Sequence, residues 1–193
     1  MNPEEKVAEE EPVLVFESRF ESGNLRRAVQ IGPYEYDLIL KYDYGTNNYT
    51  QWFYFSVKNT KKGANYKFNI INLVKPESSY NQGMKPLVYS VADQHWHRDG
   101  TNIAYYQNTL KKKGGGFYYT LTFQLQFKHD HDEVYLSHCY PYTYSDCCDH
   151  LQSLCVMKHK ERIRRTVLCR TIAGNDCDMV IITNFSSKPE DIA

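Results

Sequence analysis

One segment with strict alternation of apolar and polar side chains constrains the fold of this 193-residue chain more than any other feature. Its apolar positions are Tyr119, Leu121, Phe123, Leu125 and Phe127, and they alternate with Thr120, Thr122, Gln124 and Gln126. Successive side chains of a β-strand point to opposite faces, so the pattern places one face on a core and the other toward water. Half-buried strands of this kind are typical of antiparallel sheets.

Seven more short stretches rich in Tyr, Phe, Val and Ile lie between turn signals and are predicted as strands. The predicted strands are residues 13–17, 34–41, 51–58, 66–73, 87–91, 103–107, 117–127 and 133–140. Residues 51–55 are apolar on both faces, which predicts a central strand covered on each side. Short strands with tight connections and no helical spacers favour an antiparallel β-sandwich over residues 13–141.

The pattern changes at both ends of this region. Residues 1–12 carry five Glu against one Lys without periodicity and are expected to form a disordered acidic tail. Thr143 and Asp146 have the spacing of a capping box, which predicts a helix over residues 144–158. Residues 166–172 and 179–184 are predicted as a hairpin. This helix and hairpin, within residues 142–193, offer too little apolar surface for a core of their own, so they need a partner.

Composition excludes several classes of protein. The chain has 23 basic and 23 acidic residues, which argues against a general nucleic-acid binder. Its 17 Tyr and 9 Phe leave stacking on single-stranded nucleic acid as a rival function, but aromatic residues at alternate strand positions favour a core. No apolar run approaches the ~18 residues that cross a bilayer. The start lacks a secretory signal, so we expect a cytoplasmic protein with reduced cysteines.

Two histidine clusters are the candidates for a metal site, residues 95–97 and 129–133. Alternate residues of a strand share a face, as metal ligands do, but neither cluster offers an obvious third ligand, and the second reads equally well as a polar hairpin tip. Neither a His-Glu-x-x-His motif nor a Gly-x-Ser-x-Gly elbow occurs in the sequence. The residues by themselves indicate a mostly-β module without a catalytic constellation.

Several strings together resemble one family. They are residues 14–25, 51–55, 68–72, 75–76, 83–86, 118–123 and 140–144, and the most specific are Phe-Glu-Ser-Gly-Asn-Leu at 20–25 and Tyr-Pro-Tyr-Thr-Tyr at 140–144. The sequence is similar to the N-terminal part of the cytosolic carboxypeptidases, the tubulin deglutamylases. The likeness covers residues 13–184 in order.

The resemblance implies an antiparallel β-sandwich in front of an α/β zinc carboxypeptidase domain, with residues 142–193 as the opening helix and strands of that domain. In the family, zinc is held by a His-Pro-Gly-Glu motif and a distant second His, a Glu acts as general base, and an Arg grips the substrate carboxylate. None of the seven His here stands in that motif, so no catalytic or metal-ligating residue is carried over. We therefore expect no cofactor in this chain, zinc in the full-length family, and no carboxypeptidase activity from this chain alone.

Ten residues are expected to have structural or interface roles. They are Phe20, Gly23, Asn24, Leu25, Trp52, Phe55, Tyr140, Pro141, Tyr142 and Tyr144. The first four are predicted to form a tight turn with a packed anchor, and the next two to lie in the core. The last four are predicted at the junction between the domains and at the start of the helix, with Pro141 holding the chain extended.

Two basic segments are candidate contacts for an acidic tubulin tail. They are Lys111, Lys112 and Lys113 at a hairpin tip, and Arg162, Arg164 and Arg165 in a basic stretch. Solubilising surface charge is the alternative explanation. The expected partners are the missing carboxypeptidase domain and tubulin or other acidic-tailed proteins. Neither nucleic acid nor a membrane is expected as a partner. The expected location is the cytoplasm, together with association with microtubules. A stand-alone β-sandwich interaction module is the alternative function, and a reading frame continuing past Asn184 into His-Pro-Gly-Glu would argue against it.

Overall fold

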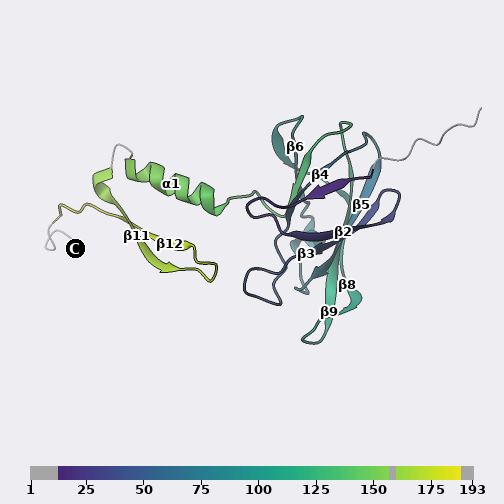
Figure 1. Ribbon diagram of the computed structural model, residues 1–193, viewed down its shortest axis with the longest axis horizontal. Coiled ribbons are helices and arrows are strands. Elements are labelled where there is room, and N and C mark those ends of the chain that lie inside the picture. The colour runs from purple at the N-terminus through teal and green to yellow at the C-terminus, as the bar shows by residue number, and fades with distance from the viewer. Residues whose placement is uncertain (1–12, 157–159, 188–193) are drawn as a thin grey trace, which may run out of the picture. The chain divides into compact units, whose positions relative to one another are not determined.

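The computed structural model describes residues 13–156 and 160–187 (Figure 1). The expected tail at residues 1–12 and the predicted helix end at residue 158 therefore lie outside the described residues. The described chain divides into two compact units, with the boundary between Pro141 and Tyr142 and with Tyr44–Thr46 grouped with the second.

The first unit contains two five-stranded sheets. One has the order β1 (Val15–Glu17), β4 (Tyr54–Lys58), β10 (Val134–Ser137), β6 (Leu87–Ser90), β7 (His95–Arg98). The other has the order β2 (Leu25–Gly32), β3 (Glu35–Leu40), β5 (Asn65–Leu73), β9 (Phe117–Gln126), β8 (Thr101–Lys111). A short 3-10 helix, η1 (Ser79–Gln82), precedes β6. The mostly-β fold with antiparallel pairing is confirmed, with one exception.

The exception is the pair β3 and β5, which is parallel, with Glu35 opposite Lys67 and Leu38 opposite Ile70. Parallel neighbours need a crossover instead of a tight turn. The chain between these strands contributes β4 to the other sheet and returns, so its short turns do not imply antiparallel neighbours. The Asn72 side chain extends the pairing, because its amide accepts a hydrogen bond from the Leu40 N–H and donates one to the Leu40 carbonyl.

Aromatic side chains from both sheets form the core of the first unit. Phe16 of β1 contacts rings of the opposite sheet, with centroids 5.1 Å from Tyr36 and 6.3 Å from Phe68. The alternation in β9 predicts one buried face correctly, because Leu121 and Phe123 are fully buried. Thr120 and Thr122 on the other face are buried as well, so the expectation that this face meets water is wrong there. Fully burying one Leu or Phe side chain contributes about 1.5–3 kcal/mol. The core therefore holds the two sheets together face to face.

Two strands of the first unit, β2 and β7, were not predicted from the sequence. Both lie at the edge of a sheet, where a strand buries little and needs no clear apolar alternation. In β2 the register also shifts between Leu25 and Arg27, which leaves one extra residue opposite β3 and disturbs the period of two.

The expectation that Trp52 lies in the core is wrong. Strand β4 begins only at Tyr54, and Trp52 is half-buried just before it. Its indole Nε1 donates a hydrogen bond to the Ser22 carbonyl at 2.8 Å, so the ring stays at the surface and closes the turn near Gly23. Phe55 is fully buried as predicted, and Phe53 is fully buried in place of Trp52.

The second unit contains α1 (Tyr144–Val156), the short 3-10 helix η2 (Lys160–Arg162) and the hairpin β11 (Ile163–Arg170) and β12 (Asp176–Ile182). The capping box is present, since the Asp146 N–H donates to the Thr143 hydroxyl at 3.1 Å and the Thr143 N–H donates to the Asp146 carboxylate at 2.8 Å. Both strands begin about three residues before their predicted positions. Apolar alternation is weak in both strands, so their predicted starts depended on the position of the turn and were inaccurate.

No described residue of the second unit is buried. Helix α1 contacts β11, yet apolar side chains of the hairpin stay open, with Leu168 64% and Ile182 69% exposed. A helix and a two-stranded sheet have too few apolar neighbours to close a core. The apolar side chains of the described helix and hairpin therefore stay at least partly exposed.

Candidate functional site

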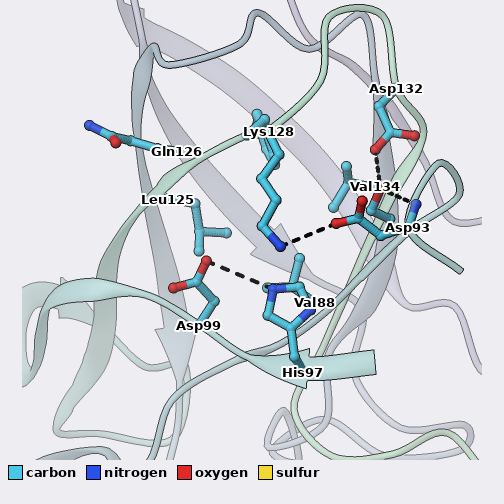
Figure 2. A pocket seen from close by; sticks show the side chains of 11 residues that line it. Val88, Asp93, His97, Asp99, Leu125, Gln126, Lys128, Asp132 and Val134 are labelled. Carbon is cyan, nitrogen blue, oxygen red and sulfur yellow. Dashed lines mark hydrogen bonds and ion pairs between the residues drawn. The ribbon is translucent and has the colours of Figure 1, made fainter. Parts of the chain in front are cut away.

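A small polar hollow lies in the first unit beside β6, β7 and the end of β9 (Figure 2). Its lining includes four titratable side chains, Asp93, Lys128, His97 and Asp99, with Asp93 joined to Lys128 and His97 joined to Asp99. The hollow has a volume of about 20 Å³. One water molecule needs about 10–15 Å³, whereas ligand pockets reach roughly 300–1,000 Å³. The hollow therefore has room for a water and not for a substrate.

Asp93 is the centre of the charged contacts at this hollow. Its carboxylate accepts from His129 Nε2 at 2.8 Å and lies 3.2 Å from Lys128 Nζ. The hydrogen bond from His129, and then that from Lys128, hold the pKa of Asp93 below its usual value. The turn before β7 fixes Asp93, because its N–H donates to the Ser90 hydroxyl at 3.1 Å. These contacts join the loop after β9 to the turn between β6 and β7.

His97 also lines the hollow. Its Nε2 lies 4.0 Å from the Asp99 carboxylate, and its buried Nδ1 has no hydrogen-bond partner in the described chain. A buried nitrogen without a protein partner is usually satisfied by water. The hollow therefore holds a buried polar group that a water molecule would satisfy.

The two histidine clusters do not converge on a common point. His95 and His97 have ring centroids 5.0 Å apart, whereas His129 turns to Asp93 and the His131 ring pairs with the Asn59 amide at 3.2 Å. Within residues 13–156 and 160–187, no group of three or more His, Cys, Asp or Glu is placed to hold a metal ion. The described residues thus do not form a ligand set for a catalytic zinc ion.

The predicted turn residues meet at the edge of the first unit. The Gly23 N–H donates to the Phe20 carbonyl at 3.0 Å, and a Cβ on Gly23 would lie 2.3 Å from the Ser18 carbonyl oxygen. Leu25 is buried, and the Phe20 ring packs 4.8 Å from that of Tyr54. The close backbone approach explains why this position is a glycine.

Asn24 completes this turn by bonding to the backbone on either side of Phe53. Its side-chain amide donates to the Trp52 carbonyl at 2.7 Å and accepts from the Tyr54 N–H at 3.0 Å. These two bonds satisfy backbone groups at the start of β4 and tie the turn to that strand.

The residues expected at the domain junction lie at the surface of the described units. Tyr140 is 62% and Tyr142 64% exposed, Pro141 is half-buried, and Tyr144 begins α1. No catalytic arrangement involves them. Their contacts with a further domain stay a prediction.

The two predicted basic segments differ in how free their charges are. Lys111, Lys112 and Lys113 lie at the tip of the β8–β9 hairpin. Arg165, in contrast, donates to both carboxylate oxygens of Asp178, at 2.8 and 2.7 Å. A bidentate pair neutralises the guanidinium, so Arg165 is less available to an acidic tail than an unpaired arginine, and its role as a tail contact stays a prediction.

The other two arginines of the second basic segment are placed differently. The Arg164 guanidinium lies over the Phe185 ring, 3.9 Å from its centroid, and Arg162 is exposed in η2. Cation–π stacking holds the first of these against the surface without removing its charge.

Sequence reasoning missed a second and larger hollow, of about 300 Å³, between the edge strands β1 and β2. Four of the residues that line it are basic: Arg19, Arg26, Arg27 and Lys41. The adjacent arginines after the tight turn were the available signal. They went unused because β2 was not predicted as a strand.

Comparison with known proteins identifies the family. The family described as the cytosolic carboxypeptidase N-terminal domain matches residues 16–140, more than half of the chain. This chain belongs to the cytosolic carboxypeptidase family. The resemblance found in the sequence is thereby confirmed.

Named relatives match almost the whole chain. Human cytosolic carboxypeptidase 2 is 45% identical over 190 residues, which cover 95% of this chain and 21% of the relative. The Xenopus tropicalis cytosolic carboxypeptidase 2 is 48% identical over 183 residues, covering 91% of this chain and 19% of the relative. Human cytosolic carboxypeptidase 1 is 45% identical over 196 residues, which cover 94% of this chain and 16% of the relative. The chain thus spans about a fifth of the length of these cytosolic carboxypeptidases.

Solved structures of metallocarboxypeptidases share the fold. A proposed carboxypeptidase A from Shewanella denitrificans has a TM-score of 0.64 at 18% identity, covering 89% of this chain and 40% of that chain. A metallo-carboxypeptidase from Burkholderia cenocepacia has a TM-score of 0.61 at 16% identity, and the match covers 87% of this chain and 39% of that chain. Among the described residues, no helix is long and apolar enough to cross a bilayer.

Proposed function

We propose that this chain serves as the N-terminal, non-catalytic portion of a cytosolic zinc carboxypeptidase that removes glutamates from tubulin. Its sandwich supports folding of the catalytic domain and helps to position the substrate or a partner. One observation carries the proposal. The region that matches this family's N-terminal domain is followed in the sequence by a helix and a hairpin, and none of their described residues is buried. Such surface is stabilised when further chain covers it.

The folding role is testable in a chimera. In human cytosolic carboxypeptidase 2, the 190 matching residues are replaced by this chain, and solubility, zinc content and glutamate release from polyglutamylated tubulin are measured. We expect the chimera to be soluble and active and the simple deletion to be neither. A deletion protein with full solubility and activity would contradict the proposal.

A matched pair of variants separates packing from general damage. Ile182→Asp places a charge on the open hairpin, and Val91→Asp places one on the surface of the first unit, where Val91 is 45% exposed. If catalytic chain covers the hairpin, Ile182→Asp lowers the melting temperature of the chimera more than Val91→Asp, whereas this chain alone tolerates both. Equal effects in the chimera would speak against the packing role.

Zinc and hydrolysis belong, in this proposal, to the part of the parent enzyme that follows. Hydrolysis at such a site needs a polarising metal and an activated water, and the described residues supply no ligand set for that metal. We expect this chain with added zinc to release no glutamate from polyglutamylated tubulin. Release that a chelator abolishes would contradict this assignment.

Location and partners follow the same proposal. We expect the protein in the cytoplasm and, through tubulin, on microtubules, with Lys111 to Lys113 as candidate contacts for acidic tails. Co-sedimentation with polyglutamylated microtubules at low and high salt measures the association, because exposed charge contacts weaken as salt rises. Equal pelleting with unmodified and polyglutamylated microtubules would contradict a role for the acidic chains.

The alternative is a stand-alone interaction module, which the open apolar side chains of α1 and the hairpin also favour. In that case the same surface binds a separate protein. A transcript that reads on into His-Pro-Gly-Glu after Asn184 would argue against the alternative, and a natural stop after Ala193 would support it.

A further inference from the structure

The hollow between β1 and β2, called here the basic edge hollow, combines two open strand edges with a local excess of positive charge. Strand β1 is the edge of one sheet and β2 the edge of the other, and residues of both line the hollow. Its volume of about 300 Å³ reaches the lower limit of known ligand pockets, roughly 300–1,000 Å³. It lies wholly within the first unit.

Most of the positive charge at this hollow is unpaired. Glu17 is fully engaged, because its carboxylate accepts from the Arg19 guanidinium at 2.6 Å and from the Arg19 N–H at 2.7 Å. These contacts lower the pKa of Glu17 to about 2, so it stays ionised and occupied at neutral pH. In the part of the chain that the structure describes, no carboxylate pairs with Arg26, Arg27 or Lys41.

The backbone explains why the cations gather there. The register shift in β2 inserts one extra residue at Arg26, and the consecutive side chains of Arg26 and Arg27 are both exposed. Bulges commonly redirect side chains in this way next to binding sites. The tight turn at Gly23 brings Arg19 to the same hollow, and Lys41 follows the end of β3.

The strand edges decide which anion fits best. An edge strand offers unpaired N–H and C=O groups, which an extended peptide can pair with as an added strand. Arginine forks match carboxylates bidentately. A single phosphate would leave most of a hollow of this size empty and would use none of the edge backbone.

We propose that the basic edge hollow binds an extended acidic peptide, with its carboxylates paired to Arg26, Arg27 and Lys41 and its backbone lying along an edge strand. The chemical class of ligand is a peptide with several consecutive carboxylates. This inference rests on the proposed function for its class of ligand and deepens it by naming a binding site on this chain. Binding by this chain needs neither zinc nor hydrolysis, so the binding test below and the activity test of the chimera can fail separately.

The test is fluorescence anisotropy of the whole chain with labelled hexaglutamate, and with hexaglutamine as the uncharged control. We expect hexaglutamate to bind with an affinity that falls as salt rises, and hexaglutamine not to bind. Arg26→Glu with Arg27→Glu should weaken binding by about tenfold or more, because like charges then face the ligand. Lys62→Glu with Lys85→Glu makes the same change in net charge at exposed positions elsewhere on the unit and should alter affinity by less than about twofold.

Two further measurements keep the outcome decisive. The paired change Arg26→Lys and Arg27→Lys retains charge but not the guanidinium fork, so we expect an intermediate loss. Circular dichroism confirms that each variant is folded. The proposal is overturned if hexaglutamate does not bind, or if both charge-reversal pairs weaken binding equally. It is also overturned if hexaglutamine binds as tightly as hexaglutamate.

Discussion

The two units of this chain treat their apolar side chains in opposite ways. In the first, rings such as Phe68 are fully buried between two sheets. In the second, every described side chain is half-buried or exposed, although helix, cap and hairpin are all formed. Local hydrogen bonding and capping are therefore sufficient to define secondary structure, whereas a core requires a second layer. The contrast predicts that substitutions act very differently in the two units.

The largest expected effect comes from the centre of the first core. Phe68→Ala removes a ring that packs 5.5 Å from Phe123 and 6.1 Å from Tyr36. We expect the free energy of unfolding to fall by about 3–5 kcal/mol, measured by urea denaturation. Leu168→Ala, at an exposed position of the second unit, should change it by less than about 0.5 kcal/mol. Similar losses for both would remove the distinction between the units.

A smaller loss is expected at the turn before β2. Gly23→Ala would place a Cβ 2.3 Å from the Ser18 carbonyl oxygen, so the backbone must shift. We expect a cost of about 2 kcal/mol in the same urea experiment. The matched control is Gly114→Ala, because nothing lies within 4 Å of a Cβ built there. A tolerated Gly23→Ala would show that the close approach is not needed.

A still smaller, pH-dependent effect is expected from His138 in the first unit. Burial, followed by the charges of Arg98 and Lys75, lowers the pKa of His138 below its ordinary value of 6.5. The unfolded chain therefore takes up a proton before the folded chain as pH falls, and the contribution of neutral His138 is lost progressively below pH 6.5.

Stability measured at pH 7.5 and 5.5 tests this dependence. His138→Gln should reduce the difference between the two conditions, while His150→Gln, at an exposed position of α1, should leave it unchanged. The Glu17 carboxylate does not confuse the result, because its pKa of about 2 places its titration at much lower pH. An unchanged difference in His138→Gln would contradict the assignment.

The last prediction concerns register in the second unit and involves the smallest change in stability. Cys169 lies opposite Cys177 across β11 and β12. Directly opposed residues have Cα atoms about 4.5–5.5 Å apart, within the range that disulfides span. With excess oxidised glutathione, the two thiols should form one disulfide and release two glutathione thiols. Tryptic mapping should link Cys169 to Cys177 and not to Cys155, and a dominant link to Cys155 would show that the register is wrong.

The sequence predicted the parts of the fold where burial imposes a period. Strand β9 shows one buried face through alternation, and α1 shows its start through the Thr143 and Asp146 cap. Edge strand β2 escaped prediction, because a bulge and two arginines obscure its period. The parallel pairing of β3 with β5 also escaped, since strand order depends on contacts between distant residues.

The candidate sites were less predictable than the fold for a similar reason. Charge alone indicated the basic stretch at Arg162 to Arg165, yet the bidentate contact of Arg165 with Asp178 depends on register across the hairpin. Conversely, the basic edge hollow joins Arg19, Arg26 and Lys41 from three segments that only the folded chain brings together.

The placement of β10 constrains how the protein is made. This strand is the last of the first unit, yet it lies in the middle of its sheet, between β4 and β6. During synthesis from the N-terminus, β4 (paired with β1) and β6 (paired with β7) therefore each keep one edge without a partner strand until residues as late as Ser137 have left the ribosome. Folding of the first unit is then complete only as the second unit begins to emerge, and truncation ahead of Val134 leaves two half-sheets prone to aggregation.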